Sequence, residues 1–173
     1  VSPDFELTPA TAPIVARISV RLDGIPLALE LAAARVRVLS VSQIAERLDD
    51  RFRLLTGGSR AALHRHQTLH AAMDWSYELL TEPERALLGR LAVFGGGWTL
   101  EAAEAICADD GASVAGEAIL DLLTRLADKS LVEVEAGTAP RYRMLETVRQ
   151  YGWEKLRAAG ELFRFRSRHR EWF

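Results

Sequence analysis

Four consecutive residues, Gly24-Ile25-Pro26-Leu27, are the group in this sequence whose types and spacing best suit ligand binding. Gly24 permits backbone angles that a β-carbon would forbid. Pro26 suits the first position of a helix, because its missing N–H costs nothing there and its φ angle is already helical. A proline beside a tight turn presents a flat apolar edge and exposed backbone groups, against which a planar base could rest. The same pattern more often marks only the start of a helix, so the residues alone leave both interpretations open.

The sequence contains no phosphate-binding loop of the form G-x-x-x-x-G-K-[ST]. The glycines at 95–97 are followed by Trp98 and Thr99, so no lysine is placed to reach a β- or γ-phosphate. Without that loop, and without an acidic strand end to hold Mg²⁺, we expect no ATP hydrolysis by this chain alone. ATPase activity would require a P-loop domain in a longer protein. We also find no other set of residues that suits an autonomous enzyme.

Histidine and cysteine give no metal site by sequence. His66 and His70 are four residues apart, but no nearby cysteine or paired acid supplies the further ligands that zinc requires. Cys107 is the single cysteine, so a disulfide framework is excluded. Its small apolar neighbours predict a buried thiol that does not react. We therefore predict that no metal is bound.

Composition and charge are those of an ordinary globular protein. Apolar residues make up 49% of the chain, and its formal net charge is −2. No apolar run approaches the ~20 residues that a membrane span requires, and the N-terminus lacks both signal-peptide features and Met. We therefore expect a piece of a longer cytoplasmic protein with no membrane partner. From Arg141 onward nine basic residues accompany four acidic ones, which favours a solvated helix face or a contact with a following domain over a nucleic-acid site.

The first third of the sequence predicts a small helical bundle. One helix is expected to begin at Thr8-Pro9, and a second to run from Pro26 to about Val38. Ser40 and Gln43 have the spacing of a capping box, which predicts the start of a third helix. The polar, glycine-rich stretch 56–60 is the best candidate for a linker.

The remainder predicts a winged helix, because several helices precede a single β-hairpin. The expected elements are helices over 68–80, 81–94, 99–106 and 115–129, strands over 131–135 and 142–144, and a last helix from 146 into the 160s. The predicted fold is therefore mainly α, a small helical bundle followed by a winged-helix domain with one hairpin wing. The expected domains are 1–56 (helical), 57–67 (linker), 68–151 (winged helix) and 152–173 (a C-terminal helix leading to a following domain).

Five blocks in a fixed order resemble the NB-ARC and wider STAND signal-transduction ATPases. The first is the GxP motif at Gly24-Ile25-Pro26-Leu27-Ala28-Leu29. The others are Met73-Asp74-Trp75-Ser76-Tyr77-Glu78-Leu79-Leu80, Leu87-Leu88-Gly89-Arg90-Leu91-Ala92-Val93-Phe94, the segment 122–132 with its Lys129-Ser130-Leu131, and Tyr142-Arg143-Met144-Leu145-Glu146-Thr147-Val148-Arg149-Gln150-Tyr151. Together they cover nearly the whole chain, and they are most similar to bacterial regulators of the AfsR/LuxR-associated type. The resemblance implies the helical (ARC1-like) and winged-helix (ARC2-like) parts of such a protein.

The resemblance also implies a nucleotide site. Gly24, Ile25, Pro26 and Leu27 would lie against the adenine of ADP or ATP in the full-length protein. The family's phosphate-sensing histidine corresponds to Leu145, which cannot donate a hydrogen bond, so that contact is absent or made elsewhere. Arg143 is the nearest residue with suitable chemistry. The implied partners are a P-loop domain upstream, a helical-repeat or sensor domain downstream, and further copies of the protein on activation.

Two functions of different classes follow. The first is a nucleotide-sensing regulatory module that switches between ADP-bound and ATP-bound states. The alternative is a winged-helix DNA-binding domain. The segment expected to read DNA contains Glu117, Asp121 and Asp128 against Arg125 and Lys129, a balance that would repel phosphates. We therefore prefer the sensor and do not expect specific DNA binding by this part of the protein.

Overall fold

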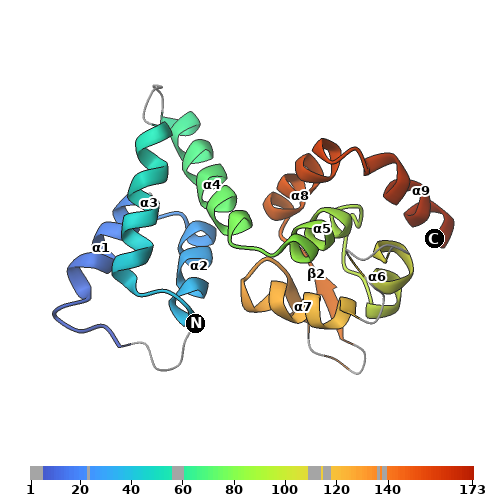
Figure 1. Ribbon diagram of the computed structural model, residues 1–173, viewed down its shortest axis with the longest axis horizontal. Coiled ribbons are helices and arrows are strands. Elements are labelled where there is room, and N and C mark those ends of the chain that lie inside the picture. Colours follow the sequence, from blue (N-terminus) through green and yellow to red (C-terminus); the bar gives the residue numbers. More distant parts are fainter. Residues whose placement is uncertain are drawn as a thin grey trace. The chain divides into compact units, whose positions relative to one another are not determined.

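The computed structural model describes residues 6–22, 24–55, 61–108, 114, 118–135, 137 and 140–173, without the side chains of 49–55 and 61–67. The chain divides into two compact units, Val1–Leu79 and Leu80–Phe173. Both units are drawn in Figure 1. Within the described ranges, no helix has both the length and the hydropathy needed to cross a bilayer.

The first unit is helical, with α1 (Ala12–Arg21), α2 (Pro26–Ala34), a 3₁₀ turn η1 (Arg35–Arg37), α3 (Val41–Leu55) and α4 (Ala61–Glu78). α1 packs on α3, and α4 packs on both α2 and α3. A single cluster of small and branched apolar side chains joins them, and it includes Ile18, Leu22, Ala28, Ala32, Ile44, Ala45, Leu48, Ala71, Ala72 and Trp75. The predicted helical bundle is therefore present.

Several boundaries in this unit differ from those expected. α1 begins after Thr11 rather than at Pro9, because Thr8 and Thr11 bond to each other through side chains and backbone and form a separate turn. The capping box that begins α3 is confirmed. The Ser40 backbone N–H donates to Gln43 Oε1 at 3.0 Å, and the Gln43 N–H donates to Ser40 Oγ at 3.2 Å.

The boundary between the units lies between Leu79 and Leu80, not in the linker expected at 57–67. Residues 61–67 are the first turns of α4, and its second half belongs to the core of the first unit. The buried Arg35 secures this packing, since its guanidinium donates to the carbonyl oxygen of Ser76 at 3.0 Å and to the hydroxyl of Ser76 at 2.6 Å. The glycine-rich stretch 56–60 lies outside the described residues.

The second unit contains α5 (Glu82–Leu91), α6 (Leu100–Cys107), α7 (Ile119–Asp128), β1 (Glu133–Glu135), β2 (Arg141–Arg143), α8 (Glu146–Ala158) and α9 (Leu162–Trp172). β1 and β2 form an antiparallel hairpin in which Val134 is opposite Tyr142. Trp98 extends this sheet, since its N–H and C=O both bond to Tyr142, at 2.8 and 2.9 Å. α5 packs against α7 and α8. This order of helices followed by a hairpin confirms the predicted winged helix.

Helix caps fix the N-terminal ends of α5 and α6, as expected. Glu84 is buried and accepts a hydrogen bond from the Thr81 N–H at 2.7 Å, while Thr99 Oγ1 accepts from the Ala102 N–H at 3.3 Å. The Glu84 carboxylate also forms an ion pair with Lys129 at the end of α7. Burial opposes ionisation of Glu84, but the bonds from Lys129 and Thr81 outweigh it, so the pKa of Glu84 is lowered.

The C-terminal segment is two helices rather than the single one expected. α8 ends because Gly160 has a φ of +74°, a left-handed conformation that favours glycine. The Gly160 N–H donates to the Arg157 carbonyl and the Glu161 N–H to the Leu156 carbonyl, which satisfies the end of the helix. α9 then returns to pack on α6. Phe165, with none of its surface exposed, anchors it.

Candidate nucleic-acid interface

The GxP motif has the backbone geometry that its residues predict. Gly24 has a φ of +62°, Ile25 is extended, and Pro26 is the first residue of α2. A Cβ at Gly24 would meet no atom within 4 Å, so conformation rather than crowding favours glycine here. Gly24 and Pro26 are exposed, and Ile25 and Leu27 are half-buried. These residues do form the start of a helix; that they also bind nucleotide stays a prediction.

The residues at the predicted phosphate-sensing position lie in the second unit. Leu145 precedes the first residue of α8, and its carbonyl accepts from the Arg149 N–H at 2.9 Å. Arg143 on β2 donates to Glu133 at 2.5 Å and lies 3.2 Å from a Glu135 carboxylate oxygen. Its guanidinium is therefore engaged across the hairpin. Gly24–Leu27 belong to the first unit, and Leu145 and Arg143 belong to the second.

Of the predicted histidine pair, only the His70 side chain is described, since that of His66 lies outside the described residues. His70 Nδ1 lies 3.0 Å from Asp74 Oδ2, one helical turn along α4. Among the described residues, no three His, Cys, Asp or Glu side chains gather as metal ligands would. Cys107 is fully buried, as predicted, and burial raises the pKa of its thiol to about 12.

α7 occupies the place of the recognition helix in a helix-turn-helix, after α6 and before the wing. Its apolar side, made of Ile119, Leu122, Leu123 and Leu126, is buried against the rest of the unit. Its exposed face is mixed in chemistry, with Leu120, Asp121, Thr124, Arg125 and Asp128. This face can offer both hydrogen-bond donors and acceptors to base edges.

The hairpin wing carries both acidic and basic side chains, and several of them form ion pairs with each other. Arg143 bonds to Glu133 and Glu135, while Arg141 donates to the Gly97 carbonyl at 2.9 Å. The acids and bases exposed on α7 and the hairpin nearly balance. On α7 itself, Asp121 and Asp128 are exposed beside Arg125, whereas Glu117 lies outside the described residues.

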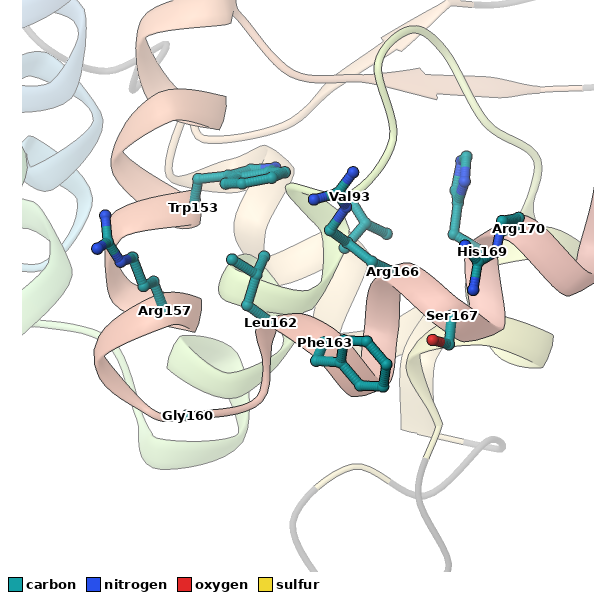
Figure 2. A pocket seen from close by; sticks show the side chains of 10 residues that line it. All are labelled: Val93, Trp153, Arg157, Gly160, Leu162, Phe163, Arg166, Ser167, His169 and Arg170. Carbon is teal, nitrogen blue, oxygen red and sulfur yellow. The ribbon is translucent and has the colours of Figure 1, made fainter.

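A cleft of about 670 Å³ lies between α8 and α9, and it was not predicted from the sequence. We call it the α8–α9 cleft; Val93, Trp153, Arg157, Gly160, Leu162, Phe163, Arg166, Ser167, His169 and Arg170 line it. Figure 2 shows Trp153 of α8 and Arg166 of α9 extending toward one another, and the Arg166 guanidinium lies 5.5 Å from the centre of the Trp153 ring. The signal in the sequence was the series of arginines after residue 156, although the break at Gly160 was needed to form a cleft from them.

The second unit is similar to a known family of domains. Residues 80–157 match the model of a family described as a winged helix-turn-helix domain. The order α5, α6, α7 and hairpin agrees with this match, so the second unit is similar to that family in both sequence and fold.

Curated relatives extend the comparison to the whole chain. A protein of Mycobacterium tuberculosis (strain H37Rv), named "Putative HTH-type transcriptional regulator", is 50% identical over 174 residues, which cover 100% of this chain and 19% of that protein. A protein of Mycobacterium bovis with the same description has the same identity and coverage. An uncharacterized protein of Mycobacterium tuberculosis is 46% identical over 172 residues, which cover 99% of this chain and 44% of the relative. The chain thus spans about a fifth of the length of the first of these relatives.

These matches change the balance between the two functions predicted from sequence. They support the winged-helix part of the resemblance and a likeness to transcriptional regulators. They do not support the NB-ARC/STAND assignment or nucleotide binding, which stay predictions. They also count against our expectation that this part of the protein does not bind DNA, because a helix-turn-helix is a DNA-reading motif.

Proposed function

We propose that this chain is the winged-helix part of a bacterial transcriptional regulator and that its second unit binds duplex DNA. The observation that carries the proposal is the helix-turn-helix and wing over residues 80–157, which agrees with the family match. In domains of this kind the second helix of the motif enters the major groove. α7 is that helix here, and its polar face is exposed.

Base contacts would come from α7 rather than from the wing. Arg125 can donate two hydrogen bonds to guanine, and Thr124 can contact either partner of a base pair. Asp121 or Asp128 can accept from the amino group of cytosine, so acidic residues on this helix are compatible with base reading. Arg141 and Arg143 on the hairpin are placed on the element that commonly contacts the backbone. The near-neutral charge of these elements implies that binding depends on base contacts and that non-specific affinity is weak.

The test is selection of duplexes from a random pool with the whole chain, followed by binding measurements by fluorescence anisotropy at physiological salt with competitor DNA. Arg125→Ala should weaken binding to the selected duplex about fivefold or more, since a good bidentate contact contributes about 1 to 3 kcal/mol. Arg17→Ala is the matched control, because Arg17 is exposed on α1 of the first unit and should leave binding unchanged. Failure to enrich any sequence, or binding that Arg125→Ala does not weaken, would contradict the proposal.

A second function, nucleotide sensing by the full-length protein, is supported by the form of the GxP motif. The left-handed Gly24, the extended Ile25 and the exposed Pro26 leave an apolar edge open to a planar ligand. The cofactor would be ADP or ATP, held mainly by a P-loop domain upstream. Calorimetry with ADP on the full-length protein tests this function, and the absence of binding would rule it out.

A further inference from the structure

The α8–α9 cleft combines arginines with apolar side chains and contains no acidic residue. Its polar lining is Arg157, Arg166, Arg170, Ser167 and His169, and its apolar lining is Val93, Trp153, Leu162 and Phe163. We propose that this cleft is a docking site for an acidic, amphipathic segment of a partner protein. The proposal goes beyond DNA binding, since it concerns another face of the second unit and a different class of partner.

The cleft is preorganised, which reduces the entropic cost of binding. Trp153 is fixed because its Nε1–H donates to the Ala92 carbonyl at 2.7 Å. The left-handed Gly160 sets the turn between the two helices. α9 is held against α6 and the residue that follows it by the buried Phe165 and by Arg168, which donates to the carbonyls of Ala105 and Ala108. The two helices that form the cleft are therefore held in place by the turn at Gly160, by the Ala92 carbonyl and by the contacts of Phe165 and Arg168.

The arginines of the cleft are not neutralised by the residues around them. Among the residues that the structure describes, Arg157, Arg166 and Arg170 have no carboxylate partner, whereas Arg143 and Arg149 each do. The nearest acid on the loop, Glu161, faces Arg90 at 3.5 Å and Arg164 at 3.9 Å. Glu154 and Glu171 lie outside the lining. These three exposed arginines are therefore available to the carboxylates of a partner.

The apolar lining favours a protein segment over nucleic acid. Phe163 lies in the first turn of α9 and is 83% exposed, and duplex DNA bound through its phosphates would leave such a side chain uncovered. An amphipathic helix instead places apolar side chains against Trp153 and Phe163 while its carboxylates meet the arginines. Aromatic and arginine side chains are also the types enriched where protein interfaces concentrate their binding energy.

Binding can be measured by fluorescence anisotropy on the whole chain. The probe is a labelled synthetic peptide with Leu and Phe at helical i, i+3, i+4 spacing and Glu elsewhere. We expect saturable binding, and each of Arg166→Gln and Arg170→Gln should weaken it about two- to fivefold, as for rim ion pairs. Phe163→Ala should weaken it about fivefold or more. The peptide with Lys in place of Glu should not bind.

Arg164→Gln is the matched control, because Arg164 lies on the same helix, carries the same charge and is outside the lining. It should leave affinity within twofold of the unchanged chain. The proposal is overturned if binding of the acidic peptide does not saturate, or if Arg164→Gln weakens it as much as Arg166→Gln does. It is also overturned if single-stranded or duplex DNA displaces the peptide and this DNA binding requires Arg166 and Arg170. Binding of the selected duplex through Arg125 should be unaffected by the cleft variants, so the two proposals fail separately.

Discussion

The crossing of α5 and α8 leaves different amounts of room at two buried glycines, Gly89 and Gly152. A Cβ at Gly89 would lie 3.6 Å from the Leu156 Cβ, an ordinary contact. A Cβ at Gly152 would lie 3.1 Å from both the Ala92 Cβ and the Leu88 carbonyl oxygen. The latter atom is backbone within the α5 helix, so it cannot move unless the helix moves. We predict that Gly152→Ala leaves the second unit less stable than Gly89→Ala does.

The magnitudes follow from two opposing effects. Replacing a helical glycine by alanine gains about 1 kcal/mol in helix propensity at either position. At Gly152 overpacking costs about 1 to 3 kcal/mol, so the two variants should differ in free energy of unfolding by that amount, with Gly89→Ala the more stable. For a unit of this size, each kcal/mol corresponds to a difference of about 4 to 8 °C in Tm.

Thermal unfolding gives the Tm, and hydrogen exchange of peptides from α5 and α8 assigns the change to the second unit. Gly89→Ala is the internal control because both substitutions are buried at the same helix crossing. If Gly152→Ala stabilises the chain as much as Gly89→Ala, the close approach of the two helices has no energetic consequence and the reasoning is wrong.

Two further predictions concern single side chains. Glu84→Gln should lower the free energy of unfolding at neutral pH by about 1.5 to 3 kcal/mol, since it removes charged hydrogen bonds to Lys129 and Thr81. Because the pKa of Glu84 is lowered in the folded state, its contribution to stability is complete above the ordinary value of 4.5 and is lost as the pH falls through the folded value. Urea unfolding at several pH values between neutral and acid should therefore show that the free energy of unfolding falls less steeply with pH in the variant. Equal slopes for the two proteins would contradict this account. Pro26→Ala in the full-length protein should lower the free energy of unfolding by about 0.4 to 1 kcal/mol. If the adenine lies against the proline, the affinity for ADP should also fall about fivefold. Unchanged ADP affinity in calorimetry would show that Pro26 serves only as the start of α2.

Features that depend on a few neighbouring residues could be predicted from the sequence. The turn at Gly24, the start of α2 at Pro26, the caps at Ser40 and Thr99 and the hairpin wing all arise from local bonds and intrinsic backbone preferences. The burial of Cys107 followed from its apolar neighbours for the same reason. These are short-range effects, and a single sequence contains the information that they require.

Other features were decided by the tertiary structure, because they depend on contacts between distant residues. α4 belongs to the first unit since Trp75 joins its core and Arg35 bonds to Ser76, 41 positions away. The sequence indicates that Arg143 has chemistry suited to phosphate, but its contact with Glu133 depends on the register of the hairpin. The α8–α9 cleft needed both the turn at Gly160 and the packing of α9 on α6. Periodicity predicts which side of a helix is buried, but it does not specify the element against which that side packs.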